Sequence, residues 1–373
     1  MGEPLRVGVV GAGNISGAYL STLAALPDLR VVAVTDHDRR RALAAAATTP
    51  GSRSVALDEL LADEEIDVVL NLTTPGAHAE VALAALAAGK HVYGEKPLAA
   101  NPADAAAVVA AANKAGLRVG CAPDTVLGVG VQTARRTIED GLIGMPTSAT
   151  ATMVGFGHER WHPDPEFYYL PGGGPLLDMG PYYLSALVHL LGPVKSVTGI
   201  GSRPRPLRTI ATGPRAGTTF QTSVDTHVTG ILEHENGVLT SLIMSFDVAA
   251  SRASHIEVHG SAGSLMVPDP NRFDGDCEVS IPAEVGWHVL PPSAGYVGAR
   301  RGIGLAEMAQ AIRDSRPHRA SADLARHVLD CSYTLLDAAD RRTTLDVRSR
   351  CEVPPLVPLD DHGFGQTPKC RPA

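Results

Sequence analysis

A glycine-rich loop near the beginning of the chain limits the possible folds more than any other feature. The apolar run Leu5–Val10 is followed by the sequence GAGNISG, residues 11–17, and then by helical spacing of apolar residues from 17 to 26. Glycines at 11 and 13 permit a tight turn and let the backbone approach a pyrophosphate. The free N–H groups at the start of the helix would then face that anion. The G-x-G-x-x-x-G spacing is looser than the usual fingerprint, but its position between a strand and a helix favours a dinucleotide site.

Strands and helices alternate through the first third of the chain. Further apolar runs at residues 29–35, 67–72, 91–93 and 117–121 alternate with helical segments at 39–47, 78–88 and 103–115. Fully apolar strands separated by helices of this length predict a parallel sheet that is covered on both faces. The expected architecture is therefore an N-terminal Rossmann domain with a doubly wound parallel sheet.

The pattern changes near residue 122. Strand-like segments follow at 147–154, at 222–234 and 238–246 around Asn236-Gly237, and at 255–258 and 264–267 around a second turn. Asn-Gly is a typical dipeptide of tight hairpins. Two stretches rich in proline and glycine, 201–217 and 282–304, are predicted to be surface loops, and helices are expected at 305–313 and 322–339. We thus predict an α/β protein in which residues 1–122 form the NAD(P)-binding domain. Residues 123–373 would form an α+β domain with an open, mainly antiparallel sheet, whose last helices could pack back on the first domain.

Charge and cysteine content exclude several classes of function. Lys plus Arg is 32 and Asp plus Glu is 40, a net charge of −8, which disfavours nucleic acid and anionic membranes as partners. The five cysteines form no C-x-x-C pair, so neither a disulfide framework nor a structural zinc site is expected. No signal peptide and no membrane span of about 18 apolar residues is recognised, and a cytoplasmic location is expected.

Asp36 ends the second predicted strand and is a candidate for selecting the cofactor. A carboxylate there accepts hydrogen bonds from the ribose hydroxyls of NAD and repels the 2′-phosphate of NADP. The three arginines at 39–41 leave NADP as an alternative, since one of them could pair with that phosphate. Asp36 could also be only a helix cap. We predict NAD.

The most specific short motif is Glu95-Lys96-Pro97, directly after the fourth strand. Ligands of open parallel sheets bind beyond the carboxyl ends of the strands, so Lys96 is expected to point at the cofactor crevice. Its ammonium group could stabilise the alkoxide that develops during hydride removal, and partial burial would let it share in proton transfer. The alternative is a surface lysine before a turn proline.

Four motifs follow one another along the chain: G-x-G-N-I-x-x-G, T-x-P-x-x-H (Thr73, Pro75, His78), A-G-K-H-V-x-x-E-K-P and G-G-G-P-L-L-D-M-G. They occur in the order seen in Gfo/Idh/MocA oxidoreductases, which this sequence resembles from Arg6 to about Leu345. The resemblance implies hydride transfer at a secondary alcohol or hemiacetal carbon of a sugar, inositol or related polyol. It implies a catalytic Lys96, a cis bond before Pro97, and a homodimer or homotetramer formed through the C-terminal sheet. The expected cofactor contacts are Gly11, Gly13, Asn14, Ile15, Asp36, Thr73, Pro75, His78, Glu95 and Lys96.

The second catalytic segment implied by the resemblance departs from the family pattern. Asp178 matches an aspartate that is commonly followed four residues later by a histidine, but Tyr182 stands at that position. An unperturbed tyrosine has a pKa of about 10, far above that of histidine. Tyr182 could relay a proton if Lys96 lowers its pKa, orient the substrate, or be a bystander, with Lys96 or His162 as acid and base. Asp178 could instead cap a helix, and Tyr182 could be part of that helix's buried face.

The remaining candidates lie in loops. Asp124 follows the fifth strand, and His158, Trp161 and His162 lie in a segment where a tryptophan could stack on a sugar; the prolines at 163 and 165 argue against a metal site there. The substrate contacts are predicted to be Lys96, Asp124, Trp161, His162, Asp178 and Tyr182, with Lys96, Tyr182 and Asp178 catalytic. The leading function is an NAD-dependent dehydrogenase or reductase. The alternatives are an NAD-retaining hydrolase or lyase and a non-enzymatic NAD-binding regulator.

Overall fold

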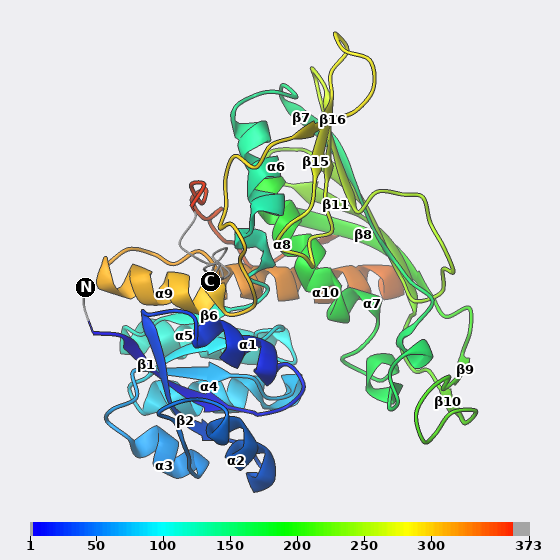
Figure 1. The fold of residues 1–373 in the computed structure, drawn as a ribbon. Helices are drawn as coiled ribbons and strands as arrows, with labels where there is room; N and C mark the ends of the chain where they lie inside the picture. The colour runs from blue at the N-terminus through cyan, green and yellow to red at the C-terminus, as the bar shows by residue number, and fades with distance from the viewer. Residues whose placement is uncertain (1–2, 361–373) are drawn as a thin grey trace, which may run out of the picture. The chain divides into compact units, whose positions relative to one another are not determined.

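The computed structural model describes residues 3–360, and these form two compact units. The first consists of residues 3–128, 294–326 and 357–360, and the second of residues 129–293 and 327–356 (Figure 1). The predicted division into domains at residue 122 stays a prediction. In the structure, the segment 294–326 belongs to the first compact unit although it lies late in the chain.

The first unit is built on a six-stranded parallel sheet. Its strands are β1 (Leu5–Val10), β2 (Leu29–Thr35), β3 (Arg53–Ser54), β4 (Val68–Asn71), β5 (His91–Gly94) and β6 (Val119–Cys121). Their order is β3-β2-β1-β4-β5-β6, and every neighbouring pair is parallel. This is the strand order of the dinucleotide-binding fold, so the predicted doubly wound parallel sheet is confirmed.

Helices connect these strands and follow the sequence closely. They are α1 (Ser16–Leu23), α2 (Arg39–Ala47), α3 (Leu57–Ala62), α4 (His78–Ala87) and α5 (Pro102–Ala115), with α9 (Ile303–Arg313) added from late in the chain. Asn101 caps α5 by accepting from the Asp104 N–H, and Gly116 ends it at φ +66°. Strand β3 and helix α3 were not predicted from the sequence, because both are too short for a periodic pattern.

The second unit contains a nine-stranded sheet of order β16-β15-β14-β13-β7-β12-β11-β8-β17. The strands are β7 (Pro146–Val154), β8 (Val194–Ser202), β11 (His227–His234), β12 (Leu239–Ser245), β13 (Ile256–Gly260), β14 (Ser264–Val267), β15 (Cys277–Ser280), β16 (His288–Leu290) and β17 (Leu345–Asp346). Only β7 and β12 pair in parallel among these strands. The expected mainly antiparallel sheet is confirmed.

Both predicted hairpins are present. The β11–β12 pair turns at Asn236-Gly237, where Gly237 has φ +86° and its N–H donates to the His234 carbonyl. The β13–β14 pair closes with the Gly260 N–H bonded to the Gly263 carbonyl. The first strand of the first hairpin begins at residue 227, five residues later than expected.

Four helices complete the second unit: α6 (Val129–Glu139), α7 (Pro175–Asp178), α8 (Gly180–Leu191) and α10 (Ala322–Arg341), of which α10 crosses the division between the units at residue 326. Helix α6 was not predicted from the sequence. Glycines 199 and 230 face each other on β8 and β11, and a Cβ atom on either would lie 2.7 Å from Leu335 of α10. Glycine there lets the helix pack close to the sheet.

The two stretches predicted to be surface loops are only partly so. The stretch 201–217 contains β9 (Leu207–Thr209), which pairs with β10 (Thr219–Gln221), and its Arg208 and Ile210 are buried. The stretch 282–304 contains β16, the buried residues Ala294 and Tyr296, and the start of α9. Most residues of both stretches are exposed as predicted, and burial is confined to single positions such as Arg208 and Ile210 and to the segment from Ala294 to the start of α9.

No helix within residues 3–360 is both long and apolar enough to cross a membrane. The cysteines in this range, Cys121, Cys277, Cys331 and Cys351, are all free thiols, and the first three are buried.

Candidate active site

The glycine-rich loop connects β1 to α1 as predicted, and Gly11 is required by its geometry. Gly11 has φ +100°, and a Cβ atom on it would lie 2.6 Å from the Leu72 carbonyl oxygen at the end of β4. Gly13 has nothing within 4 Å of such an atom, so its surroundings are open. The Gly13 carbonyl accepts from both the N–H and the hydroxyl of Ser16, which starts α1. The first turn of α1 therefore begins next to Gly13, where the space beside the backbone is open.

Asp36 lies at the end of β2, next to this loop. Its Oδ2 accepts from the Ala12 N–H at 2.7 Å, and its Oδ1 accepts from the Asp38 N–H at 2.8 Å. The residue that caps α2 is Asp38, whose side chain accepts from the Arg40 N–H, so Asp36 is not the cap. Asp36 thus places a carboxylate against the glycine loop, while the side chain of Arg40 pairs with Asp38.

The motif Thr73-x-Pro75-x-x-His78 forms a braced turn after β4. Asn71, buried at the end of β4, accepts from the Thr73 hydroxyl at 2.6 Å and donates to the His78 carbonyl. Pro75 begins the 3₁₀ helix η1 (Pro75–Ala77). The His78 ring is buried, with Nδ1 2.6 Å from the Pro97 carbonyl and Nε2 3.0 Å from the Thr73 carbonyl.

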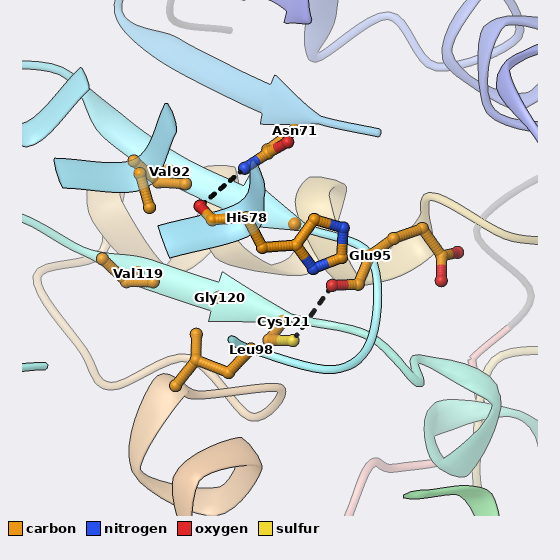
Figure 2. Close-up of a pocket in the computed structure, with 10 residues that line it drawn as sticks. Asn71, His78, Val92, Glu95, Leu98, Val119, Gly120 and Cys121 are labelled. Atoms are coloured by element: carbon orange, nitrogen blue, oxygen red, sulfur yellow. Dashed lines mark hydrogen bonds between the residues drawn. The ribbon is translucent and has the colours of Figure 1, made fainter. Parts of the chain in front are cut away.

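His78 therefore ties the turn after β4 to the Glu-Lys-Pro loop after β5. Figure 2 shows its ring beside Glu95, in a small cavity at the ends of β4, β5 and β6. A neutral imidazole has one N–H and donates to one of the two carbonyls, whereas a protonated ring donates to both. In either state both ring nitrogens face the protein's own backbone.

Glu95 is largely buried and fixes the backbone at Lys96. Its Oε1 accepts from the Tyr19 hydroxyl at 2.7 Å, and its Oε2 accepts from the Lys96 N–H at 3.0 Å. Burial, and then the charge of Glu95, raises the pKa of Tyr19 well above its usual value, so Tyr19 stays a donor. The Lys96–Pro97 bond is cis, as the resemblance implied. Tyr19 lies on α1, so this contact links the helix of the glycine loop to the lysine loop.

Asp124 is fully buried rather than open to a substrate. Its Oδ2 accepts from the N–H groups of Gly302 and Gly304 at the start of α9, at 2.7 and 3.1 Å. Burial raises its pKa to about 6, although these two bonds and Arg301 act in the opposite direction. Its Oδ1 has no hydrogen-bond partner within the described residues. In this structure the side chain anchors the first turn of α9.

In the second unit, Asp178 pairs with a histidine that the sequence analysis had not assigned to it. Nε2 of His158, in the 3₁₀ helix η3 (His158–Arg160), lies 2.7 Å from Oδ2 of Asp178. Asp178 is the last residue of α7, and the N-cap position of α8 is Met179, so Asp178 does not cap α8. Tyr182 is in the first turn of α8, a helix whose residues are all buried, and the residue is 5% exposed.

Aromatic side chains surround this His158–Asp178 pair. The His158 ring lies 4.1 Å from Tyr168, 4.5 Å from Phe246 and 5.1 Å from Trp161, measured between ring centroids. His162 and Phe167 extend the group, and Trp161 and Phe167 are more than half exposed. We call Trp161, His162, Phe167 and Tyr168 the aromatic shelf. Of the predicted substrate contacts, Trp161 thus lies against the histidine that pairs with Asp178, and His162 joins the cluster through Trp161 and Tyr168.

A buried ionic network is hydrogen-bonded to the backbone of His158 through Tyr169. The Arg208 guanidinium lies 3.1 Å from Glu159 and 2.7 Å from Asp247, and its side chain is 1% exposed. Glu159 also accepts from the Tyr169 hydroxyl, which in turn accepts from the His158 N–H. Burial, and then the hydrogen bond to Glu159, raises the pKa of Tyr169 above its usual value. The backbone of His158 is therefore fixed through Tyr169.

Sequence reasoning missed several residues of this arrangement. Tyr19 and Asn71 lie inside apolar elements and gave no motif, while His158 was noted only as a loop histidine. Arg208 lay in a stretch expected to be exposed. A polar residue in an apolar element or in a predicted loop indicates a functional site only when its hydrogen-bond partners are known. No group of three or more His, Cys, Asp or Glu residues suited to a metal occurs within residues 3–360.

Comparisons with known proteins agree with this fold. Residues 5–122 match the model of an oxidoreductase family with an NAD-binding Rossmann fold, and residues 131–266 match the GFO/IDH/MocA C-terminal domain. The chain is 28% identical to trans-1,2-dihydrobenzene-1,2-diol dehydrogenase from Bos taurus, over 83% of this chain and 88% of that protein. It is 30% identical to dTDP-3,4-didehydro-2,6-dideoxy-alpha-D-glucose 3-reductase from Saccharopolyspora spinosa, over 72% and 75%.

Solved structures show the same fold over nearly the whole length. An NAD binding oxidoreductase from Klebsiella pneumoniae superposes with a TM-score of 0.80 at 24% identity, covering 93% of this chain and 99% of that one. The apo form of levoglucosan dehydrogenase gives a TM-score of 0.80 at 22% identity, covering 94% and 100%. From the two family matches and the relatives, we conclude that this chain belongs to the GFO/IDH/MocA family of oxidoreductases, with an NAD-binding Rossmann fold in its first part.

Proposed function

We propose that this protein is an NAD-dependent oxidoreductase that transfers a hydride between nicotinamide and a secondary alcohol or ketone of a sugar, inositol or related diol or polyol. The observation that carries the proposal lies in the first unit. The carboxyl ends of β1, β2 and β5 bring together the glycine loop, Asp36 and the Glu95-Lys96-Pro97 loop. Relatives named as diol and sugar-nucleotide oxidoreductases support this class of substrate.

The glycine loop fits a dinucleotide. The space beside Gly13 is open, and the closely packed turn at Gly11 leaves no room for a side chain. The first-turn N–H groups of α1 suit a pyrophosphate, and Asp36 suits the ribose hydroxyls. When bound there, the nicotinamide ring supplies the hydride acceptor or donor.

Asp36 supports NAD over NADP. A carboxylate fixed by the N–H groups of Ala12 and Asp38 would repel a 2′-phosphate at the same position. We expect NADH to bind more tightly than NADPH in a fluorescence titration, and Asp36→Ser to reduce that preference. NADPH binding at least as tight as NADH would contradict the assignment.

The proton of the substrate hydroxyl must leave when its carbon loses a hydride. We infer that the Lys96 ammonium stabilises the developing alkoxide and shares in the transfer of that proton. Asp178 and Tyr182 are proposed as the other catalytic groups, and Trp161 and His162 as substrate contacts. Thr73, His78 and Glu95 would position the two loops, because their hydrogen bonds go to the protein's own residues. Pro75 would start the turn after β4. Asp124 is not part of the proposed substrate site because its carboxylate is fully buried.

Turnover separates this proposal from its alternatives. Purified protein is given NAD⁺ with a panel of inositols, aldoses and cyclic diols, and NADH with the matching ketones, and absorbance is followed. We expect a substrate-dependent net change that Lys96→Met abolishes while NADH still binds. Product formed without net NADH would indicate an enzyme that recycles its cofactor. Tight binding with no product from any substrate would favour a regulator.

Assembly and location are also proposed. Ile200, Ile231 and Leu239 are exposed on the outer face of three neighbouring strands, β8, β11 and β12. Exposed apolar side chains on an open sheet favour association, so we propose a homodimer or homotetramer through this sheet. The free thiols within the described residues are compatible with a reducing compartment, and we propose the cytoplasm. Light scattering of the wild type and of Ile231→Lys tests the interface.

A further inference from the structure

The His158–Asp178 pair leaves one ring nitrogen facing away from the carboxylate. Nε2 lies 2.7 Å from Oδ2 of Asp178, and an ionised carboxylate can only accept, so the proton of a neutral ring stays on Nε2. Nδ1 is then an acceptor. Within residues 3–360 it has no hydrogen-bond partner, and the two side chains remain 15% and 16% exposed. The geometry therefore offers a single oriented acceptor to a hydroxyl donor.

This acceptor is held rigidly. The rings of Tyr168, Phe246 and Trp161 pack against the His158 ring, with centroids 4.1, 4.5 and 5.1 Å away. The His158 N–H also donates to the Tyr169 hydroxyl at 2.9 Å. Tyr169 is in turn bonded to Glu159 of the buried ionic network. A group held by packing and by further hydrogen bonds discriminates better than a mobile one, because little order is lost on binding.

The aromatic shelf beside the acceptor is open to solvent. Trp161 and Phe167 are 59% and 56% exposed, which is unusual for large aromatic side chains clustered together. Such a surface suits the apolar C–H face of a ring-shaped molecule. The carboxylate of Asp178 disfavours an anionic substrate at the same place.

We propose that His158 is a specificity-determining residue that accepts a hydrogen bond from a second hydroxyl of a neutral cyclic substrate, one that does not itself react. Asp178 fixes the tautomer, and the aromatic shelf covers one face of the substrate ring. The proposal rests on the proposed dehydrogenase function and refines its substrate class to cyclic compounds with at least two hydroxyl groups. It gives His158 a role in binding and none in the transfer of the reacting proton.

Two probes test it, trans-cyclohexane-1,2-diol and cyclohexanol, which share the oxidisable carbon and differ by one hydroxyl. Binding is measured apart from turnover. The chain has two tryptophans, so Trp287→Phe leaves Trp161 as the only fluorescent indole, 5.1 Å from the His158 ring. Each probe is titrated against this protein with NAD⁺ present. We expect the diol to bind about tenfold more tightly than cyclohexanol, as one oriented hydrogen bond allows.

His158→Phe keeps a ring of similar size and removes both nitrogens. We expect the preference for the diol to fall to about twofold or less, with cyclohexanol binding unchanged. His288→Phe is the matched control, because His288 also pairs with a carboxylate, Glu284 at 3.3 Å, but on an edge strand. If His158→Phe does not fold, Asp178→Asn tests the same claim by releasing the tautomer, and it should also reduce the preference.

An unchanged preference in a folded His158→Phe or Asp178→Asn variant would overturn the proposal. Equal binding of both probes by the wild type would also overturn it. A third refuting result is a His158→Phe variant in which kcat for cyclohexanol falls as much as kcat for the diol, because His158 would then act on the reacting hydroxyl. Failure of the dehydrogenase function is a different result. It would appear as absence of turnover in the wild type, whereas the fluorescence ratio would still report on His158.

Discussion

Replacing Arg208 by methionine is the most informative test of the second unit. The substitution keeps an unbranched side chain of similar length and removes a guanidinium that is 1% exposed. Glu159 and Asp247, themselves 5% and 8% exposed, would lose the cation that lies 3.1 and 2.7 Å from them. Removing one partner of a buried ion pair typically costs about 3–5 kcal/mol, because the remaining charge is left uncompensated.

The expected loss lies at the lower end of that range. Arg205 remains 2.9 Å from Asp247 and 3.7 Å from Glu159, and it is one-third exposed, so it compensates the two carboxylates in part. We therefore expect the free energy of unfolding of the second unit to fall by about 3 kcal/mol. For a unit of this size, the melting temperature should fall by roughly 6–12 °C.

The assay is thermal and urea unfolding followed by circular dichroism, with Arg215→Met as control. Arg215 also contacts two carboxylates, Asp164 and Glu166, but it is half exposed, so its loss should cost less than about 1 kcal/mol. Equal effects of the two substitutions would refute the reasoning that burial gives the Arg208 network its importance. Adding Glu159→Gln and Asp247→Asn to Arg208→Met should recover part of the loss.

Three further predictions concern the first unit. Gly11→Ala should abolish NADH binding and lower the melting temperature, because Gly11 has φ +100° and a Cβ atom there would lie 2.6 Å from the Leu72 carbonyl oxygen. Gly13→Ala should weaken NADH binding without changing stability, because nothing lies within 4 Å of a Cβ atom at that position. Asp124 has a folded pKa of about 6, above the usual 3.8, so its contribution favours folding at low pH and is lost as the pH rises through 6. Relative to wild type, Asp124→Asn should therefore gain about 2.4 kcal/mol in unfolding free energy between pH 4 and pH 7. A difference between the two proteins that does not change with pH would contradict the burial of this charge. Tyr19→Phe removes a hydrogen bond to the Glu95 carboxylate and should cost about 1.5–3 kcal/mol in urea unfolding; a loss below about 0.5 kcal/mol would show that this contact does not stabilise the loop.

The parallel sheet could be predicted because its signals are local. Each strand of the first unit that is longer than two residues is a short apolar run, and the glycines, Asp36 and the Glu-Lys-Pro motif all follow such runs. Parallel strands place their carboxyl ends at one edge, so residues far apart in sequence were expected to meet there. The structure confirms the sheet and its order, and it places Asp36 against the glycine loop.

Other features have no local signal. Helix α6 has an apolar face interrupted by Gln132, Thr133 and Arg135, which are all buried in the structure, so its periodicity was hidden. The stretch 201–217 has the composition of a loop, yet it supplies the buried Arg208. Both errors have the same cause, because polar residues become part of a core when distant segments provide their partners.

The sequence by itself determined the fold class, the place of the cofactor loop and the lysine loop, and the departure at Tyr182, because each depends on residues adjacent in the chain. Only the tertiary structure decided which side chains pair across long distances. It gave Asp178 a histidine twenty positions earlier in the chain, gave Glu95 the hydroxyl of Tyr19, and buried Asp124 against α9. Such pairings arise from packing of whole elements, whose free energy is summed over many weak contacts, and no short motif encodes them.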